Sequence, residues 1–381
     1  MPITYPHFGS LTYVFESLMR GLGRNDLIIP YKPSKKTAEL GERYSPEFIC
    51  TPFKLTLGTF IEGLERGATE LAIGGCNGYC RFGYYWPVQK LILRDLGYEN
   101  FTFKTINYDE PSGILRDLKN NFSDGFTYYE TLKTLRHVWL VNRLTDMVDQ
   151  LKYHYRALEV TDGQTEALAE EAYKMIVKAS SSVRDIRELW RHFPVLFKQR
   201  IDINKRAYPL RIAVVGEIYV VLEPALNLDI FRRLNKLGVI TETPITLRRY
   251  CDIGRKLNPF HKMENKKADE AAKPYVAHRV GGEVRESIGE TILFKKRAWD
   301  GIIHLYPFTC MPEIISRSIL PEVSENYDMP VLSLVVNEQT GEAGFQTRLE
   351  AFIDLLIRKR KKRGMNEISS EEIINHLEVL Y

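Results

Sequence analysis

Five cysteines are the residues of this chain whose type and spacing best predict chemistry. Cys76 and Cys80, with three residues between them, lie in the glycine-rich stretch 74–85, whose backbone N–H groups can donate to the sulfides of a metal cluster. Cys50 and Cys310 each lie among prolines and aromatic residues. Thiolates are soft ligands that select zinc, copper(I) and iron–sulfur clusters. Because two cysteines cannot close a site, all four are candidate metal ligands.

The spacing of Cys76 and Cys80 alone does not select one metal. It falls within the range of structural zinc sites, but these sites normally bring a second close pair of ligands, which this sequence does not offer. Ordinary buried cysteines are the simpler alternative. Cys251 lies in a polar segment beside Asp252, and we interpret it as a bystander.

The candidate ligands follow predicted strands. Residues 70–73 are typical of a short buried strand, and the apolar spacing of 88–96 predicts a helix ending at Gly97, so the first cysteine pair lies on a strand-to-helix turn. Residues 301–306 form another predicted strand that leads to Cys310. Since ligands of α/β proteins lie at the carboxyl ends of strands, two such sites can converge on one interdomain cleft.

Three regions are predicted from the element order. Residues 1–110 read as an α/β domain, 111–205 as a helical insertion without strands, and 206–381 as a second α/β domain. The expected elements are strands at 3–5, 27–30, 210–215 and 329–336, and helices at 10–22, 37–44, 53–67, 128–158, 165–180, 228–237 and 345–359. Residues 246–273 are polar and are predicted to be loop-rich.

The predicted fold is therefore α/β, with two Rossmann-like parallel-sheet domains, a helical insertion and a cluster in the interdomain cleft. The second domain lacks the GxGxxG pattern, so a dinucleotide is not indicated. The basic run 358–363 is interpreted as a solvated helix end or tail, and a nucleic-acid patch is the less favoured alternative.

Composition narrows the class of protein. A chain of 381 residues with 44% hydrophobic residues can bury a sizeable core, and its net charge of +4, from 53 basic and 49 acidic residues, gives no reason to expect a nucleic-acid partner. The N-terminus lacks the pattern of a signal peptide, and no stretch is long and apolar enough to span a membrane. We expect a cytoplasmic protein whose odd cysteine number excludes a disulfide framework.

Charged and polar residues near the cysteines are secondary candidates. His7 and His304 follow or end predicted strands, and Lys54 and Arg81 closely follow cysteines, where a cation offsets thiolate charge. Carboxylates in comparable loop positions, which can also cap helices, are Glu47, Glu217 and Glu313.

Four blocks of sequence carry a resemblance: YSPEFICTPFK at 44–54, CNGYCRFGYY at 76–85, GEIYV at 216–220 and PFTCMPE at 307–313. As a set they resemble the activase-related proteins of the 2-hydroxyacyl-CoA dehydratase and benzoyl-CoA reductase superfamily. The resemblance spans most of the chain, and its most specific blocks are the second and the fourth.

The resemblance implies an oxygen-sensitive iron–sulfur cluster between two α/β domains, reduced by a separate ATP-hydrolysing activase. Cys50, Cys76, Cys80 and Cys310 match the family's cysteine positions, and four ligands satisfy one [4Fe–4S] cluster. One expectation is a cluster-dependent reductase or dehydratase component that acts on an acyl-CoA or a small molecule. The alternative is an electron carrier or binding protein whose fully ligated cluster performs no catalysis.

Overall fold

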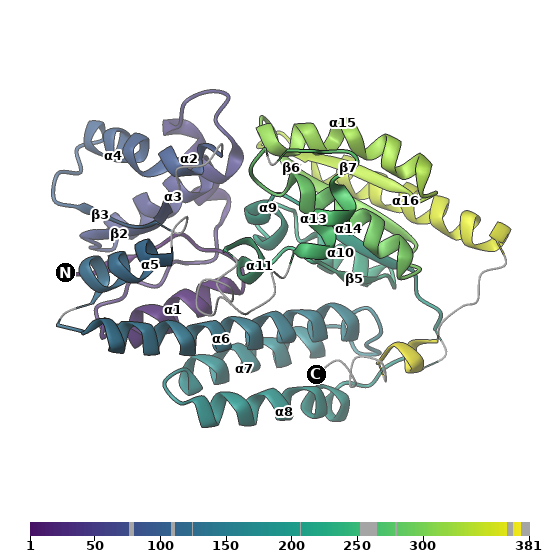
Figure 1. Cartoon of the computed structure of the whole chain (residues 1–381), viewed down its shortest axis with the longest axis horizontal. Helices are drawn as coiled ribbons and strands as arrows, with labels where there is room; N and C mark the ends of the chain where they lie inside the picture. Colours follow the sequence, from purple (N-terminus) through teal and green to yellow (C-terminus); the bar gives the residue numbers. More distant parts are fainter. Residues whose placement is uncertain are drawn as a thin grey trace.

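The protein is an α/β protein with two parallel sheets, one of three strands in the order β1-β2-β3 and one of four in the order β5-β4-β6-β7 (Figure 1). The structure, a computed structural model, describes residues 1–75, 80–107, 111–123, 125–205, 207–251, 265–278, 280–363 and 369–374. Within these residues, no helix combines the length and the apolar content needed to cross a bilayer.

The three-stranded sheet consists of β1 (Ile3–Thr4), β2 (Glu70–Gly75) and β3 (Thr102–Asn107). The helices between its strands are α1 (Leu11–Gly21), α2 (Lys35–Tyr44), α3 (Thr51–Glu65), the 3-10 helix η1 (Arg81–Tyr84) and α4 (Tyr85–Asp95). The sequence specifies where α2 begins, because Ser34 and Thr37 form a reciprocal capping box. Helix α3 begins after Cys50 with a proline in its first turn, where the missing N–H costs no hydrogen bond.

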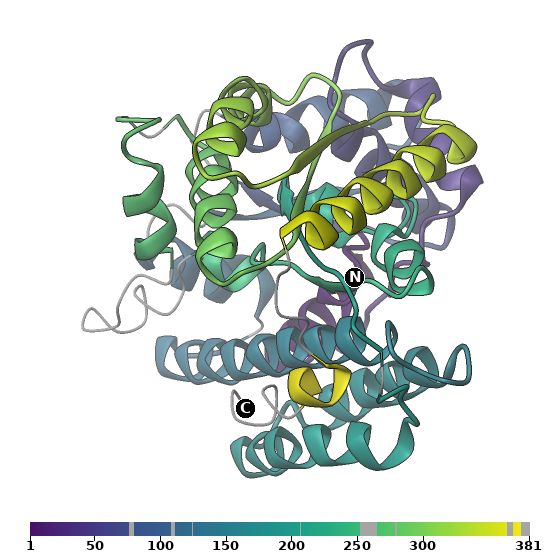
Figure 2. The ribbon, with the colours of Figure 1, turned by 90° about the vertical axis from the view of Figure 1, so that its right-hand side faces the viewer.

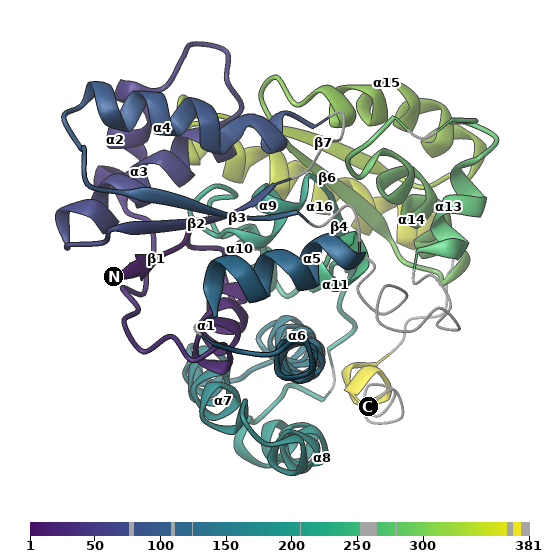
Figure 3. The same ribbon diagram turned by 60° about the vertical axis from the view of Figure 1, so that its left-hand side comes forward.

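The helical region lies beneath both sheets in Figure 1. It consists of α5 (Pro111–Asp117), the π-helix η2 (Leu118–Phe122), α6 (Tyr128–Tyr155), α7 (Gln164–Ala179) and α8 (Val183–Arg200). Helix α6 contacts α1 and α5 on one side and α10, α11 and β5 on the other, and Figure 3 shows α5 between the three-stranded sheet and α6. Buried residues such as Val141, Leu144 and Val148 each contribute about 1.5–3 kcal/mol to this packing.

The four-stranded sheet consists of β4 (Arg211–Gly216), β5 (Ile240–Glu242), β6 (Gly301–Pro307) and β7 (Val331–Val336). Its helices are α9 (Ile218–Leu222), α10 (Ile230–Lys236), α11 (Leu247–Cys251), α13 (Lys266–Ala272), α14 (Val284–Lys296), α15 (Met311–Asn326) and α16 (Glu342–Arg363). All seven residues of β6 are buried, as expected for a central parallel strand with helices on both faces (Figure 2).

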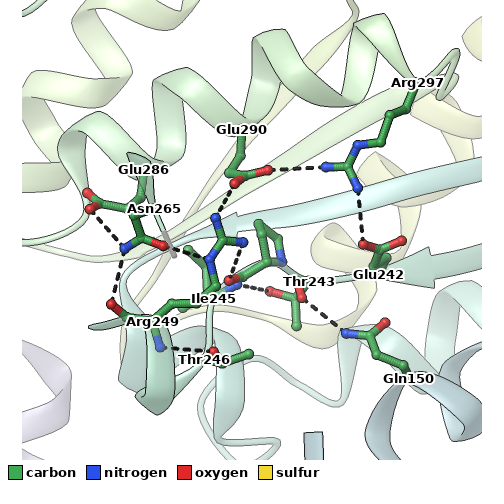
Figure 4. A network of polar contacts seen from close by, with 11 residues as sticks. Gln150, Glu242, Thr243, Ile245, Thr246, Arg249, Asn265, Glu286, Glu290 and Arg297 are labelled. Atoms are coloured by element: carbon green, nitrogen blue, oxygen red, sulfur yellow. Dashed lines mark hydrogen bonds and ion pairs between the residues drawn. The ribbon is translucent and has the colours of Figure 1, made fainter. Parts of the chain in front are cut away.

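A network of charged side chains fixes α11 against α14 at the edge of this sheet (Figure 4). Arg249 of α11 binds Glu290 of α14 and donates to Pro244 O at 3.0 Å and Asn265 Oδ1 at 2.6 Å. Arg297 continues the network by pairing with Glu290 at 3.2 Å and Glu242 at 3.5 Å. The buried Glu290 carboxylate is thus held by two guanidinium groups, which offsets the cost of its burial.

Several expected elements differ from the structure. The prediction of a strand at 27–30 is wrong, because Leu27 alone forms a β-bridge, an isolated one to Ile3. The prediction of a loop-rich 246–273 is wrong at both ends, where α11 and α13 form; 252–264 lies outside the described residues. The short strands β3 and β5 were not expected. The basic run 358–363 belongs to α16, as predicted, although Arg360 binds Asp300 at 2.6 Å instead of being solvated.

Gly216 ends β4 and is required by the close approach of β6. Its φ is +135°, and an added Cβ would lie 1.8 Å from Leu305 O. We expect Gly216→Ala to lower the free energy of unfolding by at least about 3 kcal/mol, from backbone strain and overlap together. The control is Gly344→Ala in α16, where a Cβ meets nothing within 4 Å and stability should stay the same or rise by up to about 1 kcal/mol. Urea unfolding measures the stability of both variants, and equal effects would contradict this account of the close approach of β6 to Gly216.

Candidate functional site

Three cysteines of the described residues occupy the same position relative to a helix. Cys50, Cys80 and Cys310 are the N-cap residues of α3, η1 and α15, and none of their side chains makes a capping hydrogen bond. In α3 and α15 the cysteine is followed two residues later by proline, at Pro52 and Pro312. The N-terminus of a helix carries partial positive charge, so this position favours negative charge on sulfur.

Arg81 ties the loops of these cysteines together. Its guanidinium donates to Phe48 O at 3.2 Å, to Thr309 O at 2.6 Å and to Thr309 Oγ1 at 3.0 Å. Thr309 also donates directly to Phe48 O at 3.0 Å. We call this contact between the loops of Cys50, Cys80 and Cys310 the Arg81 junction. It joins the half of the chain with the three-stranded sheet to the half with the four-stranded sheet.

The backbone is strained at the Arg81 junction. Phe48 has φ of 56° and Thr309 has φ of 67°, the left-handed region that residues other than glycine rarely adopt. Each such residue costs about 1–3 kcal/mol and persists only where surrounding contacts hold it. Here the two strained carbonyl groups are the acceptors of Arg81, so its hydrogen bonds compensate for the strain.

Burial raises the pKa of all three thiols. Cys50 is 8% exposed, and its Sγ lies 2.6 Å from Tyr85 Oη. Burial, together with the nearby Glu283 and Glu217, raises the pKa of Cys80 to about 12. Burial, Glu217 and Glu313 raise the pKa of Cys310 further still. Without a metal ion the thiols therefore keep their protons at neutral pH.

Three carboxyl groups lie near the thiols. Glu217 caps α9 and accepts from the backbone N–H groups of Tyr219 at 3.1 Å and Val220 at 2.9 Å, while Glu283 accepts from Ile218 N at 3.2 Å. Burial raises the pKa of Glu217 to about 7, and burial next to Glu217 raises that of Glu283 well above its ordinary value. Two neighbouring buried carboxylates cannot both ionise readily, so this pair retains a proton near neutral pH.

The third carboxyl group, Glu313, is completely buried in α15. Its Oε2 is 2.7 Å from His304 Nε2 and accepts from Ser287 Oγ at 3.0 Å, whereas its Oε1 has no partner. His304 also lies 3.2 Å from Ser333 Oγ in the neighbouring strand. His304 is therefore hydrogen-bonded to Glu313, which lies three residues after Cys310.

A cavity of about 230 Å³ lies beside these groups. Cys80, Cys310, Glu217 and Glu283 line it together with apolar side chains of α1, β2, α6 and α9, and no Lys, Arg or His is among the described residues that line it. Asn142 of α6 also lines it, 2% exposed, with an amide oxygen that has no hydrogen-bond partner. The arrangement suits an uncharged ligand next to sulfur.

The predicted ligands are placed as follows. The loops that carry Cys50, Cys80 and Cys310 meet at the Arg81 junction, whereas Cys76 and the side chain of Cys251 lie outside the described part of the chain. Within the described ranges, no three Cys, His, Asp or Glu side chains form a group that can hold a metal ion. The four-cysteine site therefore remains a prediction.

The secondary candidates have partners of their own. His7 Nδ1 lies 2.6 Å from Glu223 Oε2, and Lys54 pairs with Glu338 at 2.5 Å, so neither interacts directly with sulfur. Glu47 is exposed. Glu217 and Arg81 do lie at the site, although Arg81 acts mainly by joining loops.

Three site residues were missed from sequence: Tyr85, Asn142 and Glu283. The burial of Asn142 could have been detected from the sequence, because the helical spacing of Val138, Val141 and Thr145 puts its side chain on the buried face of α6. Glu283 follows two glycines in a segment with no strand or helix signal, so nothing local distinguishes it from a solvated carboxylate.

Comparison with models of protein families gives no match, and none of the curated proteins matches the chain. The function is therefore argued from the geometry of the site and from the residue patterns of the sequence.

Arg81 can be tested through stability. Arg81→Gln removes the bonds to two carbonyl groups and should lower the free energy of unfolding by about 2–3 kcal/mol, since hydrogen bonds from charged donors contribute about 1.5–3 kcal/mol. Arg66→Gln is the matched control, because Arg66 donates to one carbonyl, Ile29 O at 2.8 Å, at an exposed position; it should cost under about 1 kcal/mol. Urea unfolding measures both, and an Arg81 effect no larger than that of Arg66 would refute the junction.

The pKa of Glu217 predicts how stability depends on pH. A folded pKa of about 7, against 4.5 in the unfolded chain, means that the folded protein holds a proton that the unfolded chain has lost between these pH values. The free energy of unfolding should therefore fall as pH rises from about 4.5 to about 7. Glu283, whose pKa is also raised by burial next to Glu217, adds in the same direction, as do Cys80 and Cys310 at higher pH.

The measurement is urea unfolding of the reduced protein at several pH values between 5 and 8. Glu217→Gln should flatten the dependence, because glutamine has no proton to lose. Parallel curves for the wild type and the variant would show that Glu217 has an ordinary pKa.

Proposed function

We propose that the protein is an iron–sulfur protein of the 2-hydroxyacyl-CoA dehydratase-like kind, with two Rossmann-like domains and a cluster in the cleft between them. The observation that carries the proposal is the Arg81 junction, where the loops of Cys50, Cys80 and Cys310 meet although they come from distant parts of the chain. Two of the N-cap cysteines, Cys80 and Cys310, line one cavity, which is more than an apolar core requires.

The donor set fits such a cluster in chemistry. The three described thiols are soft and free of disulfides, and Cys50 and Cys310 are buried while Cys80 is partly buried. Cys76 is the fourth ligand on the grounds of sequence, and the set then satisfies one [4Fe–4S] cluster. A bound cluster would supply one-electron chemistry at low potential. Because the thiols are protonated without metal, binding of a cluster must release these protons. The positive charge of iron would then offset the thiolate charge, which the surrounding carboxyl groups cannot do.

The residues of the chain have separate roles in this proposal. Arg81 holds the cysteine loops in register, Tyr85 donates a hydrogen bond to Cys50 once its sulfur is deprotonated, and Glu217 with Glu283 holds a proton at the cavity wall. The electron donor is an ATP-hydrolysing activase, and the substrate is a small molecule or an acyl-CoA. The setting is a reducing, anaerobic cytoplasm, since such clusters are oxygen-sensitive.

A second function is electron transfer without catalysis. Four cysteines would occupy all four irons of a cluster, leaving none open for a substrate. The cavity beside Cys80 and Cys310 favours catalysis, because a pure electron carrier has no need of an enclosed space next to its cluster. We therefore prefer a cluster-dependent reductase or dehydratase component.

Anaerobic purification followed by iron and sulfide analysis tests the proposal. We expect a brown protein with about four irons and four sulfides per chain. Replacing a cysteine that ligates the cluster by serine should remove most of the iron, so the four single variants of Cys50, Cys76, Cys80 and Cys310 show which cysteines are ligands. Cys251→Ser is the control that retains the iron.

The variants also separate the alternatives. Loss of iron from all four supports a closed site, while retention in one identifies an iron open to substrate. A colourless protein with bound zinc would refute the iron–sulfur proposal in favour of a structural zinc site.

A further inference from the structure

The cavity has the features of a ligand site that no motif predicted. Its volume of about 230 Å³ exceeds the roughly 150 Å³ of an apolar cavity that takes up benzene. Its lining includes the aromatic residues Phe8, Phe15 and Phe82 and the aliphatic residues Ile73, Ile106 and Leu135. A compact, ring-sized apolar group fits this space.

Asn142 indicates that the ligand also has a polar group. Its side chain lines the cavity and is 2% exposed, and its Oδ1 has no hydrogen-bond partner in the protein. A buried amide oxygen left unpaired costs about 1–3 kcal/mol. A hydroxyl group on the ligand would remove this cost by donating to Asn142.

The charges around the cavity exclude an anion. Glu217 and Glu283 form part of its wall, and no Lys, Arg or His is among the described lining residues. A carboxylate placed there would lose its water without gaining a cationic partner. The carboxyl groups of the wall would add repulsion whenever one of them is ionised.

We propose that this cavity binds a compact, uncharged, mostly apolar molecule whose hydroxyl group donates to Asn142, adjacent to Cys80 and Cys310. As a statement about substrate it rests on the proposed function, but the binding itself does not need the cluster. The enclosed group can belong to a free molecule or to the end of a thioester.

Binding of three probes to the anaerobically purified full-length protein tests the proposal. Phenol, toluene and benzoate have similar size and differ in polarity and charge. Calorimetry or ligand-observed NMR at pH 7 should give phenol about five- to tenfold tighter than toluene, the range expected for one hydrogen bond. Benzoate should bind far more weakly than either.

Asn142→Leu keeps the size of the side chain but removes the acceptor, so it should abolish the preference for phenol while toluene still binds. Thr145→Val is the control on the same helix, because Thr145 is buried and bonds to Val141 O without lining the cavity. Equal affinity for phenol and toluene in the wild type, a preference that persists in Asn142→Leu, benzoate binding as tight as phenol, or no binding of phenol and toluene would each overturn the proposal. The wild-type comparison remains decisive if Asn142→Leu does not fold.

Competition against phenol by a coenzyme A thioester with a phenyl group distinguishes the two sources of the ligand. Displacement supports the end of a thioester, and its absence supports a free molecule. Iron content is measured on the same samples. A protein that contains iron but fails the probe test retains the proposed function, whereas iron-free protein that binds phenol retains the cavity assignment.

Discussion

The site depends on one guanidinium group. Arg81 follows Cys80 directly and donates to one carbonyl group in the loop of Cys50 and one in the loop of Cys310, both of which belong to residues with left-handed backbone. Carbonyl groups in this conformation have no hydrogen-bond partner in a helix or strand. A guanidinium group, which has several N–H donors in a fixed geometry, can pair with both. The same contact fixes the distance between the N-termini of α3 and α15. Arg81 therefore both positions the cysteine loops and compensates for their backbone strain.

The electrostatics around Cys80 and Cys310 differ from those around reactive cysteines. Reactive cysteines normally lie near cations that lower the pKa, but here Glu217, Glu283 and Glu313 surround them and burial raises it. Helix N-termini at Cys50 and Cys310 oppose this effect only partly. Such thiols are protected from oxidation and alkylation in the absence of metal. A site of this kind becomes anionic only when a metal ion supplies the compensating charge.

Much of the fold could be predicted because its signals are local. The buried strands β2, β4 and β6 are continuous apolar runs, and α2 and α6 begin at capping boxes. The strands β3 and β5 were missed because β3 is only half buried and alternates weakly, while β5 has three residues. The start of the segment 246–273 looked like a loop because Arg249 resembles a surface residue in the sequence, and its partner Glu290 lies far along the chain.

The candidate site was also predictable only where its signals are local. Cysteines are rare and their spacing is visible, so Cys50, Cys80 and Cys310 could be named, whereas the role of Arg81 depends on carbonyl groups that carry no residue identity. The cavity could not be predicted, since its apolar walls come from α1, β2, α6 and α9, and each apolar wall residue alone resembles ordinary core. The unpaired oxygen of Asn142, together with the carboxyl groups of Glu217 and Glu283 in the wall, distinguishes this space from a packing defect. An empty packing defect is dry and apolar throughout, whereas buried polar groups that line a cavity are normally paired by a ligand or by ordered water.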